Sequence, residues 1–239
     1  MVGPAEKALA DLRDRLQQQS RMPALPAGWH SHSAMIPADG FEYGGDFFVA
    51  DLVDDVLQLV LVDVCGHGDS AVPAAVQFAG ALRGLVAALP AEEVMDAVNR
   101  YLLGIAGEES FTTAVQVILD LRTGRYRIHS AGHPPVLHWV PAAGEWQVDN
   151  ARGTALGVTD DPDFDLSTGV LGAGEAFLFY TDGVVESRRA DIDAGIEWLR
   201  RTARATVADG IAGAAGRILQ QVRRGEDDRA ILVLGRDAA

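Results

Sequence analysis

Four aspartates stand where apolar, strand-like runs of this chain meet glycine or a further charge. They are Asp46 in GGDFF, Asp63 in LVLVDVCGHG, Asp182 in FLFYTDGV and Asp227 in GEDDRAILVL. A carboxylate at the end of a buried strand costs free energy unless a positive charge meets it. The pattern therefore predicts a fold in which distant strand ends converge around a cation.

The order of the expected elements indicates an α+β fold with antiparallel sheets covered by helices. The strand candidates occur in runs, FFVADLV with VLQLVLVDV, then FTTAVQVILDL, RYRIHSA and PVLHWV, then AFLFY and AILVLG. The acidic Asp54-Asp55 pair and Thr123-Gly124 are expected to form hairpin turns. Helices are expected over AVPAAVQFAGALRGLVAALP, over residues 91–105, and from IEWLRR to QQVRR with a break near Gly210.

The spacing of apolar residues near the beginning of the chain predicts an amphipathic helix whose apolar side packs against another surface. Residues 5–19 carry Ala8, Leu12 and Leu16 at near-helical spacing among charges, and the prolines of MPALPAG end the pattern. We therefore divide the chain into an amphipathic lead helix or linker, 1–22, and one domain, 23–239. The lead helix is a candidate contact for a homodimer or for a sensor partner.

Composition excludes several classes of function. A formal charge of −14 and a pI near 4.7 disfavour nucleic acid and anionic membrane surfaces as partners. The single cysteine, Cys65, rules out an internal disulfide and a cysteine-rich zinc site. The beginning does not resemble a secretory signal, and no run of 18 apolar residues follows, so we expect a cytoplasmic protein without membrane insertion.

Four carboxylates form an oxygen-only donor set, which favours Mg²⁺ or Mn²⁺ over zinc. Two such ions about 3.5 to 4 Å apart activate water for in-line attack on phosphorus. An aspartate before glycine is also a common turn residue, so it is the joint placement of all four that favours a metal site.

Five ordered motifs resemble the SpoIIE-type, RsbU-like branch of the PPM metal-dependent serine/threonine phosphatases. They are GGDFF, VDVCGHG, FTTAVQVILD with TGRYRIHSAGHPPVL, GEAFLFYTDGVVES and DDRAILVL, and the likeness runs from about Leu16 to Arg236. The resemblance implies a four-layer α-β-β-α sandwich of two antiparallel sheets flanked by helices. It also implies hydrolysis of phosphoserine or phosphothreonine on a partner protein by metal-activated water. The implied partner is a STAS-type anti-anti-sigma factor in a bacterial partner-switching pathway.

The resemblance also implies roles for individual residues. Asp63 would bridge two ions, the backbone carbonyl of Val64 would bind one, and Asp182 with Asp227 would bind the other. Asp46 would bind a metal directly or through its water, which makes Asp46 and Asp63 the catalytic candidates. Asp228 would fix the loop by hydrogen bonds.

Three positions depart from the family pattern. Cys65 stands where eukaryotic relatives carry a histidine that resembles a general acid, the stretch SAMIPA lacks a basic residue before Pro37, and Arg229 replaces a more usual hydrophobic residue. Two alternatives therefore stay open. One is a catalytically silent PPM-fold binding module. The other is a zinc hydrolase that uses His67, His129 and His133, although we expect His67 to be a loop or helix-start residue and the other two to be structural histidines in a turn.

Overall fold

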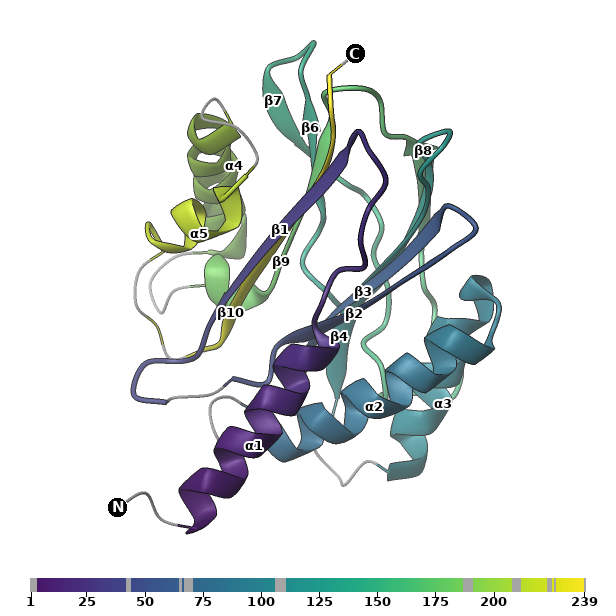
Figure 1. Ribbon diagram of the computed structural model, residues 1–239, viewed down its shortest axis with the longest axis vertical. Helices are drawn as coiled ribbons and strands as arrows, with labels where there is room; N and C mark the ends of the chain where they lie inside the picture. Colours follow the sequence, from purple (N-terminus) through teal and green to yellow (C-terminus); the bar gives the residue numbers. More distant parts are fainter. Residues whose placement is uncertain are drawn as a thin grey trace.

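The computed structural model describes residues 4–41, 44–64, 66, 71–105, 111–186, 191–207, 212–222, 225 and 227–238. Two five-stranded sheets, antiparallel at every strand pair, lie face to face, with helices on both outer faces (Figure 1). The expected α+β class and the four-layer α-β-β-α sandwich are therefore confirmed.

The first sheet has the order β2-β3-β4-β5-β8. Its strands are β2 Phe47–Val53, β3 Val56–Val64, β4 Thr112–Asp120, β5 Arg125–Ala131 and β8 Leu166–Val170. Asp54 and Asp55 join β2 to β3 with φ angles of 50° and 65°, the left-handed pair that a two-residue type I′ hairpin turn requires. The predicted hairpin is thus confirmed, and it places the beginning of β2 beside the end of β3.

The second sheet has the order β1-β10-β9-β6-β7. Its strands are β1 Trp29–Ile36, β6 Leu137–Val140, β7 Glu145–Val148, β9 Ala176–Tyr180 and β10 Arg229–Arg236. β10 pairs antiparallel with both β1 and β9, although these strands are far apart in sequence. The end of β9 therefore lies beside the beginning of β10.

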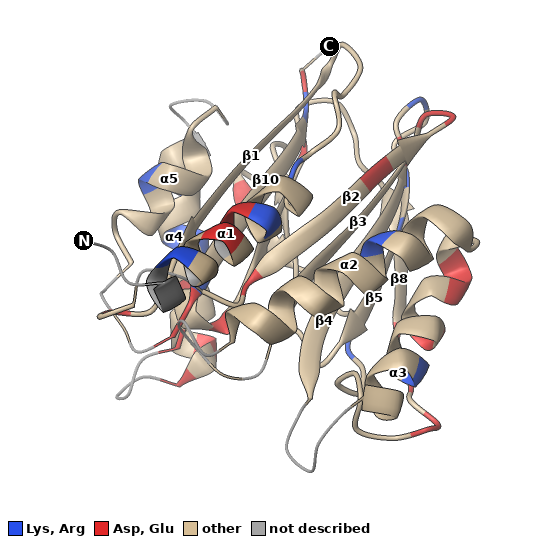
Figure 2. Cartoon of the chain, turned by 60° about the horizontal axis from the view of Figure 1, so that its bottom comes forward, with Lys and Arg blue, Asp and Glu red and all other residues tan. Residues whose placement is uncertain are grey.

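Three apolar clusters separate the four layers. One lies between the sheets, where Leu59 and Leu61 of β3 meet Phe177 and Phe179 of β9. The second packs the first sheet against α2 Val72–Ala88 and α3 Val94–Ile105, which follows the short 3-10 helix η2 Ala91–Glu93. The third packs the other sheet against α4 Ile192–Val207, α5 Ala214–Leu219 and the 3-10 helix η3 Asp182–Val184. Figure 2 shows that the middle of β3 and β4 carries no charged residue, as expected for strands buried on both faces.

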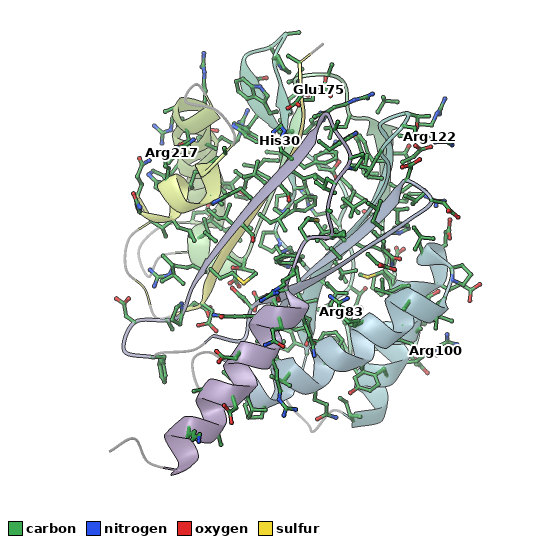
Figure 3. All side chains as sticks on the ribbon, viewed as in Figure 1. His30, Arg83, Arg100, Arg122, Glu175 and Arg217 are labelled. Atoms are coloured by element: carbon green, nitrogen blue, oxygen red, sulfur yellow. The ribbon has the colours of Figure 1, made fainter. Side chains whose placement is uncertain are left out.

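The lead helix, α1 Pro4–Gln19, packs on α2 and β2. Leu16 is 5% exposed and belongs to the apolar cluster of the first sheet. Arg83 of α2 donates to the carbonyl of Gln19 at 2.6 Å, and Figure 3 shows Arg83 where the end of α1 meets α2. The hydroxyl of Ser20 accepts a hydrogen bond from the backbone N–H of Phe48 at 3.2 Å. The lead helix is therefore in contact with the strand that follows Asp46.

The remaining helices form as expected where the chain is described, except that α5 ends at Leu219, before the predicted end in QQVRR. Two helices, α4 and α5, lie on either side of the expected break, and Gly210 itself lies outside the described residues. Within the described ranges, none of the helices combines the length and the apolar character needed to span a bilayer. The domain boundary at residue 22 stays a prediction.

Candidate active site

The four predicted aspartates come from the strand ends that the two sheets bring together. Asp46 directly precedes β2 and Asp63 is the penultimate residue of β3. Asp182 follows β9 by two residues, and Asp227 precedes β10 by two. Their charges act on one another, since the charges of Asp182 and Asp227 raise the pKa of both Asp46 and Asp63. One electrostatic cluster therefore draws two carboxylates from each sheet.

Asp46 is buried, with 8% of its surface exposed. Burial raises the pKa of Asp46 well above its usual value, and the charge of Asp228 raises it further. A hydrogen bond from the hydroxyl of Thr181 to Asp46 Oδ2 at 2.8 Å opposes this rise. The same Thr181 oxygen accepts the backbone N–H of Ala230 at 2.8 Å. Thr181 therefore fixes one oxygen of Asp46 relative to the second sheet.

Asp63 and Asp182 face each other from opposite sheets. Burial first, and then the charges of Asp46, Asp182 and Asp227, raise the pKa of Asp63 to about 10. Burial and then the charge of Asp227 raise the pKa of Asp182 to about 6. The two side chains are hydrogen-bonded to each other, which requires a proton on one of them. A divalent cation would replace that proton and relieve the repulsion.

Asp227 and Asp228 have different surroundings, as predicted. Asp227 Oδ1 accepts the backbone N–H of Asp228 at 2.8 Å, and its charge acts on the other three aspartates. Asp228 accepts backbone N–H groups with both oxygens, from Ala38 at 2.8 Å and from Gly45 at 2.6 Å. The prediction that Asp228 fixes the loop by hydrogen bonds is confirmed.

Glycines make this close packing possible. A Cβ at Gly44 would lie 2.7 Å from the carboxyl carbon of Asp228. A Cβ at Gly183 would collide with the backbone carbonyl of Asp228. The glycines of GGD and TDG are therefore required where two backbones approach the carboxylates.

The donor chemistry of the cluster fits a hard divalent cation. All four side chains offer oxygen, and the backbone of Val64 adds a carbonyl at the end of β3. In the described part of the chain, no three His, Cys, Asp or Glu side chains form an already assembled metal cage. A Mg²⁺ ion bound by these oxygens would retain several waters, as it usually does when carboxylates bind it. The individual ligand assignments stay predictions.

The described histidines do not share a site. His129 lies within β5, not in the expected turn, and the charges that act on it are those of Arg127, Glu92 and Asp96. His133 is 4% exposed, and its Nδ1 is 2.8 Å from the hydroxyl of Thr113, the residue paired with Asp63 across β3 and β4. Burial lowers the pKa of His133 to about 3, so this histidine is neutral at physiological pH.

The turn was the wrong setting for His129, because β5 continues to Ala131, and the structural role expected of both histidines stays a prediction. Their separate surroundings give no support to a zinc centre built on them. Cys65 and His67 lie outside the described residues.

A small cleft of about 80 Å³ opens beside Asp46. Its lining comes from α1, from the end of β1 and from the strand ends of the site, namely Leu16, Gln17, Ser20, Met35, Ile36, Pro37, Gly44, Asp46, Asp228 and Arg229. Sequence reasoning did not find the roles of Thr181 and Arg229. A threonine directly before Asp182, at the end of a buried strand, was the one available signal.

Comparison with known families decides the relationship. The family model of stage II sporulation protein E (SpoIIE) matches residues 54–237. The chain belongs to the SpoIIE family. The phosphoserine phosphatase RsbP of Bacillus subtilis, a relative of this SpoIIE-family chain, is 26% identical over 151 residues, which are 61% of the chain and 37% of RsbP. The chain thus spans about a third of the length of the curated relatives it matches.

Solved structures confirm the PPM phosphatase fold expected for a SpoIIE-family member. The RsbU and RsbW domains of Rv1364c from Mycobacterium tuberculosis superpose with a TM-score of 0.80 at 30% identity, over 92% of this chain and 63% of that one. RsbX, solved in complex with magnesium, superposes with a TM-score of 0.67 at 16% identity, over 90% of this chain and 98% of RsbX. At that identity the likeness to RsbX concerns the fold.

Proposed function

We propose that this SpoIIE-family chain is a Mg²⁺- or Mn²⁺-dependent protein phosphatase domain that hydrolyses phosphoserine or phosphothreonine on a partner protein. The observation that carries the proposal is the cluster of buried Asp46 with half-buried Asp63, Asp182 and Asp227, in which burial and repulsion raise the pKa of Asp46, Asp63 and Asp182. Such a cluster costs folding free energy unless it binds a cation.

In this proposal the chain's own residues hold and orient two ions. Asp63 would be the ligand shared by both ions, as the family resemblance implies, and the charges of the other three aspartates all act on it. The carbonyl of Val64 and the side chains of Asp182, Asp227 and Asp46 complete the protein ligands. Divalent cations held in this way supply Lewis acidity toward a phosphoryl group and toward the attacking water.

The second-sheet residues would keep these ligands in place. Thr181 orients Asp46 through its 2.8 Å hydrogen bond. The glycines at 44 and 183 leave room for the carboxylates to approach. Asp46 and Asp63 are the catalytic candidates because they lie on adjacent strands of one sheet and face the ligands of the other.

The proposed substrate is a phosphorylated STAS-type anti-anti-sigma factor in a partner-switching pathway. Support comes from the SpoIIE-type motifs and from the similarity to RsbP, which is named as a phosphoserine phosphatase. The net charge of −14 leaves a phosphorylated surface dependent on local positive charge, which bound cations would provide.

The test is the release of phosphate from p-nitrophenyl phosphate and from a phosphoserine peptide, with and without Mn²⁺. We expect metal-dependent turnover in the parent and a loss of at least a hundredfold in Asp63→Asn, because loss of a bridging ligand disrupts both ions. Asp51→Asn on β2 is the matched control and should keep parental turnover. Equal, metal-independent rates in the parent and in Asp63→Asn would favour the silent binding module instead.

The proposed contact of the lead helix with a second copy or a sensor partner needs a separate test. Deletion of residues 1–20 should change the oligomeric state in size-exclusion chromatography with light scattering, or change the turnover. If neither changes, the lead helix has no role in assembly or regulation.

A further inference from the structure

Asp228 joins two separate segments to the beginning of β10. Its Oδ1 accepts the backbone N–H of Ala38, at the end of the segment that leaves β1, and its Oδ2 accepts the backbone N–H of Gly45. The side chain is buried, with Asp228 only 4% exposed. Since charge-assisted bonds to a buried carboxylate are among the stronger hydrogen bonds in proteins, both segments are held firmly.

Arg229, the next residue, holds the first of these segments from the other side. Its Nη2 donates to the carbonyl of Pro37 at 2.9 Å and lies 3.4 Å from Asp39 Oδ1. Arg229 is 3% exposed, although arginine is rarely buried without partners. The backbone N–H of Asp39 donates in turn to the carbonyl of Gly225 at 2.9 Å, which ties the segment to the approach to β10 a second time.

Asp228 reaches Asp46 through one peptide group. Gly45, whose N–H binds Asp228, directly precedes Asp46. Gly44 has no room for a side chain, because the carboxylate of Asp228 fills that space. Asp228, Arg229 and Asp46 also line the same cleft. Asp228 therefore holds the residue before Asp46 directly, and Arg229 holds the segment 37–39 that shares the carboxylate of Asp228.

We propose that Asp228 and Arg229 form a positioning pair that fixes Asp46 relative to the carboxylates of the second sheet. The pair deepens the proposed function, since Asp46 is there a metal ligand, but its structural part holds in the metal-free protein. Arg229 thus replaces a hydrophobic residue of the family pattern by a side chain that fixes the segment 37–39. With its guanidinium buried against Pro37 and Asp39, Arg229 is a positioning residue and not a ligand of the substrate phosphate.

The first measurement is hydrogen exchange in the metal-free protein, which depends neither on metal nor on activity. Arg229→Leu should increase the exchange rate of the amides in residues 37–46 at least severalfold, measured at residues 38–41 and 44–46, and Asp228→Asn should do the same at Ala38 and Gly45. The matched control is Arg236→Leu at the other end of β10, where Arg236 donates to the carbonyl of Leu171 and lies over Trp29. The control should leave the exchange of residues 37–46 unchanged.

The second measurement is Mn²⁺ affinity by isothermal titration calorimetry. Loss of a residue that orients a metal ligand weakens metal binding by about 10- to 100-fold, so we expect about a tenfold loss in Arg229→Leu. Arg229→Lys, which keeps one donor for the carbonyl of Pro37, should recover most of this loss. A residue that merely stabilised the fold would lower the melting temperature in both Arg229→Leu and Arg236→Leu without changing the Mn²⁺ affinity of either.

Two results would overturn the inference. The first is unchanged exchange in residues 37–46 together with unchanged Mn²⁺ affinity in Arg229→Leu. The second is unchanged exchange with a higher KM for the phosphoserine peptide at constant kcat, which would make Arg229 a contact of the substrate phosphate. If the parent protein binds no Mn²⁺ but the exchange effects appear, the pair orders the loop as described and the proposed function fails.

Discussion

Neutralising Asp63 should stabilise the metal-free protein, although it should abolish the proposed activity. The pKa of Asp63 in the native state is about 10, against 3.8 for an unperturbed aspartate. The native state therefore binds a proton more tightly than the unfolded state does, and stability falls as the pH rises from 3.8 toward 10. The Asp63→Asn variant has no proton to take up at this position, so it avoids this cost.

The magnitude follows from proton linkage. Each pH unit above 3.8 costs about 1.36 kcal/mol, which amounts to about 4 kcal/mol at pH 7. The buried amide that Asp63→Asn introduces has a desolvation cost of its own, of about 1 to 3 kcal/mol. We therefore expect Asp63→Asn to gain about 2 kcal/mol in free energy of unfolding, or about 4 to 8 °C in melting temperature for a chain of this size.

The assay is thermal and urea unfolding in EDTA at several pH values, followed by the same series in Mn²⁺. In EDTA the advantage of Asp63→Asn over the parent should grow between pH 5 and 9. In Mn²⁺ the order should reverse, because only the parent gains stability from tight binding of the ion. Asp51→Asn, the same chemical change on β2, should differ little from the parent in either series.

The reasoning is refuted if Asp63→Asn is less stable than the parent in EDTA at pH 8. It is also refuted if Mn²⁺ raises the melting temperature of both proteins equally. The first result would mean that groups of the protein offset the charge of the carboxylates without a cation. The second would place the ion elsewhere.

Three further predictions concern the fold around the site. Gly183→Ala should lower the free energy of unfolding by more than about 2 kcal/mol, because its Cβ collides with the carbonyl of Asp228. Gly80→Ala on α2 is the control, since a Cβ there meets no atom within 4 Å, and it should be neutral or stabilising by about 1 kcal/mol in urea unfolding. The pKa of His133 is about 3 in the native state and 6.5 when unperturbed, so the unfolded state gains the proton first as the pH falls. The free energy of unfolding of the parent should therefore fall by about 2 kcal/mol between pH 7 and 5 through this group. In His133→Gln the free energy of unfolding should depend correspondingly less on pH. Leu16→Ala should cost about 2 to 4 kcal/mol in denaturant unfolding, since Leu16 is 5% exposed within the core, and a loss below about 0.5 kcal/mol would mean that α1 is not part of the folded unit.

The helices and most strands could be predicted from sequence because their signals are local, whereas β1, β7 and β8 were not among the predicted strands. The hairpin of β2 and β3 followed from two apolar runs around Asp54 and Asp55, and residues with a left-handed tendency join them as expected. The clustering of the four aspartates also followed, because each ends or begins a buried strand. The strand candidate RYRIHSA already contained His129, and the turn expected for this histidine rested on Gly132 and the two prolines, which follow the end of β5.

The supporting contacts of the site could not be predicted, because they join residues far apart in sequence. Thr181 and Asp46 are separated by 135 positions, and Arg229 and Pro37 by 192. Neither threonine nor arginine has a periodic pattern that predicts such a partner. From the sequence, Arg229 is only a departure from the hydrophobic residue that is usual at this position. The fold shows that its charge lies against the segment that leaves β1.

Because each sheet contributes half of the carboxylates, the thickness of the apolar layer between the sheets sets the width of the site. Side chains such as Leu59 and Phe179, remote from any chemistry, act as spacers whose volume fixes how far apart the opposing oxygens stand. Repacking that layer with bulkier residues would leave a well-folded protein in which the opposing carboxylates lie at the wrong distance. In this architecture the interior sets the spacing of the carboxylates as well as stabilising the fold.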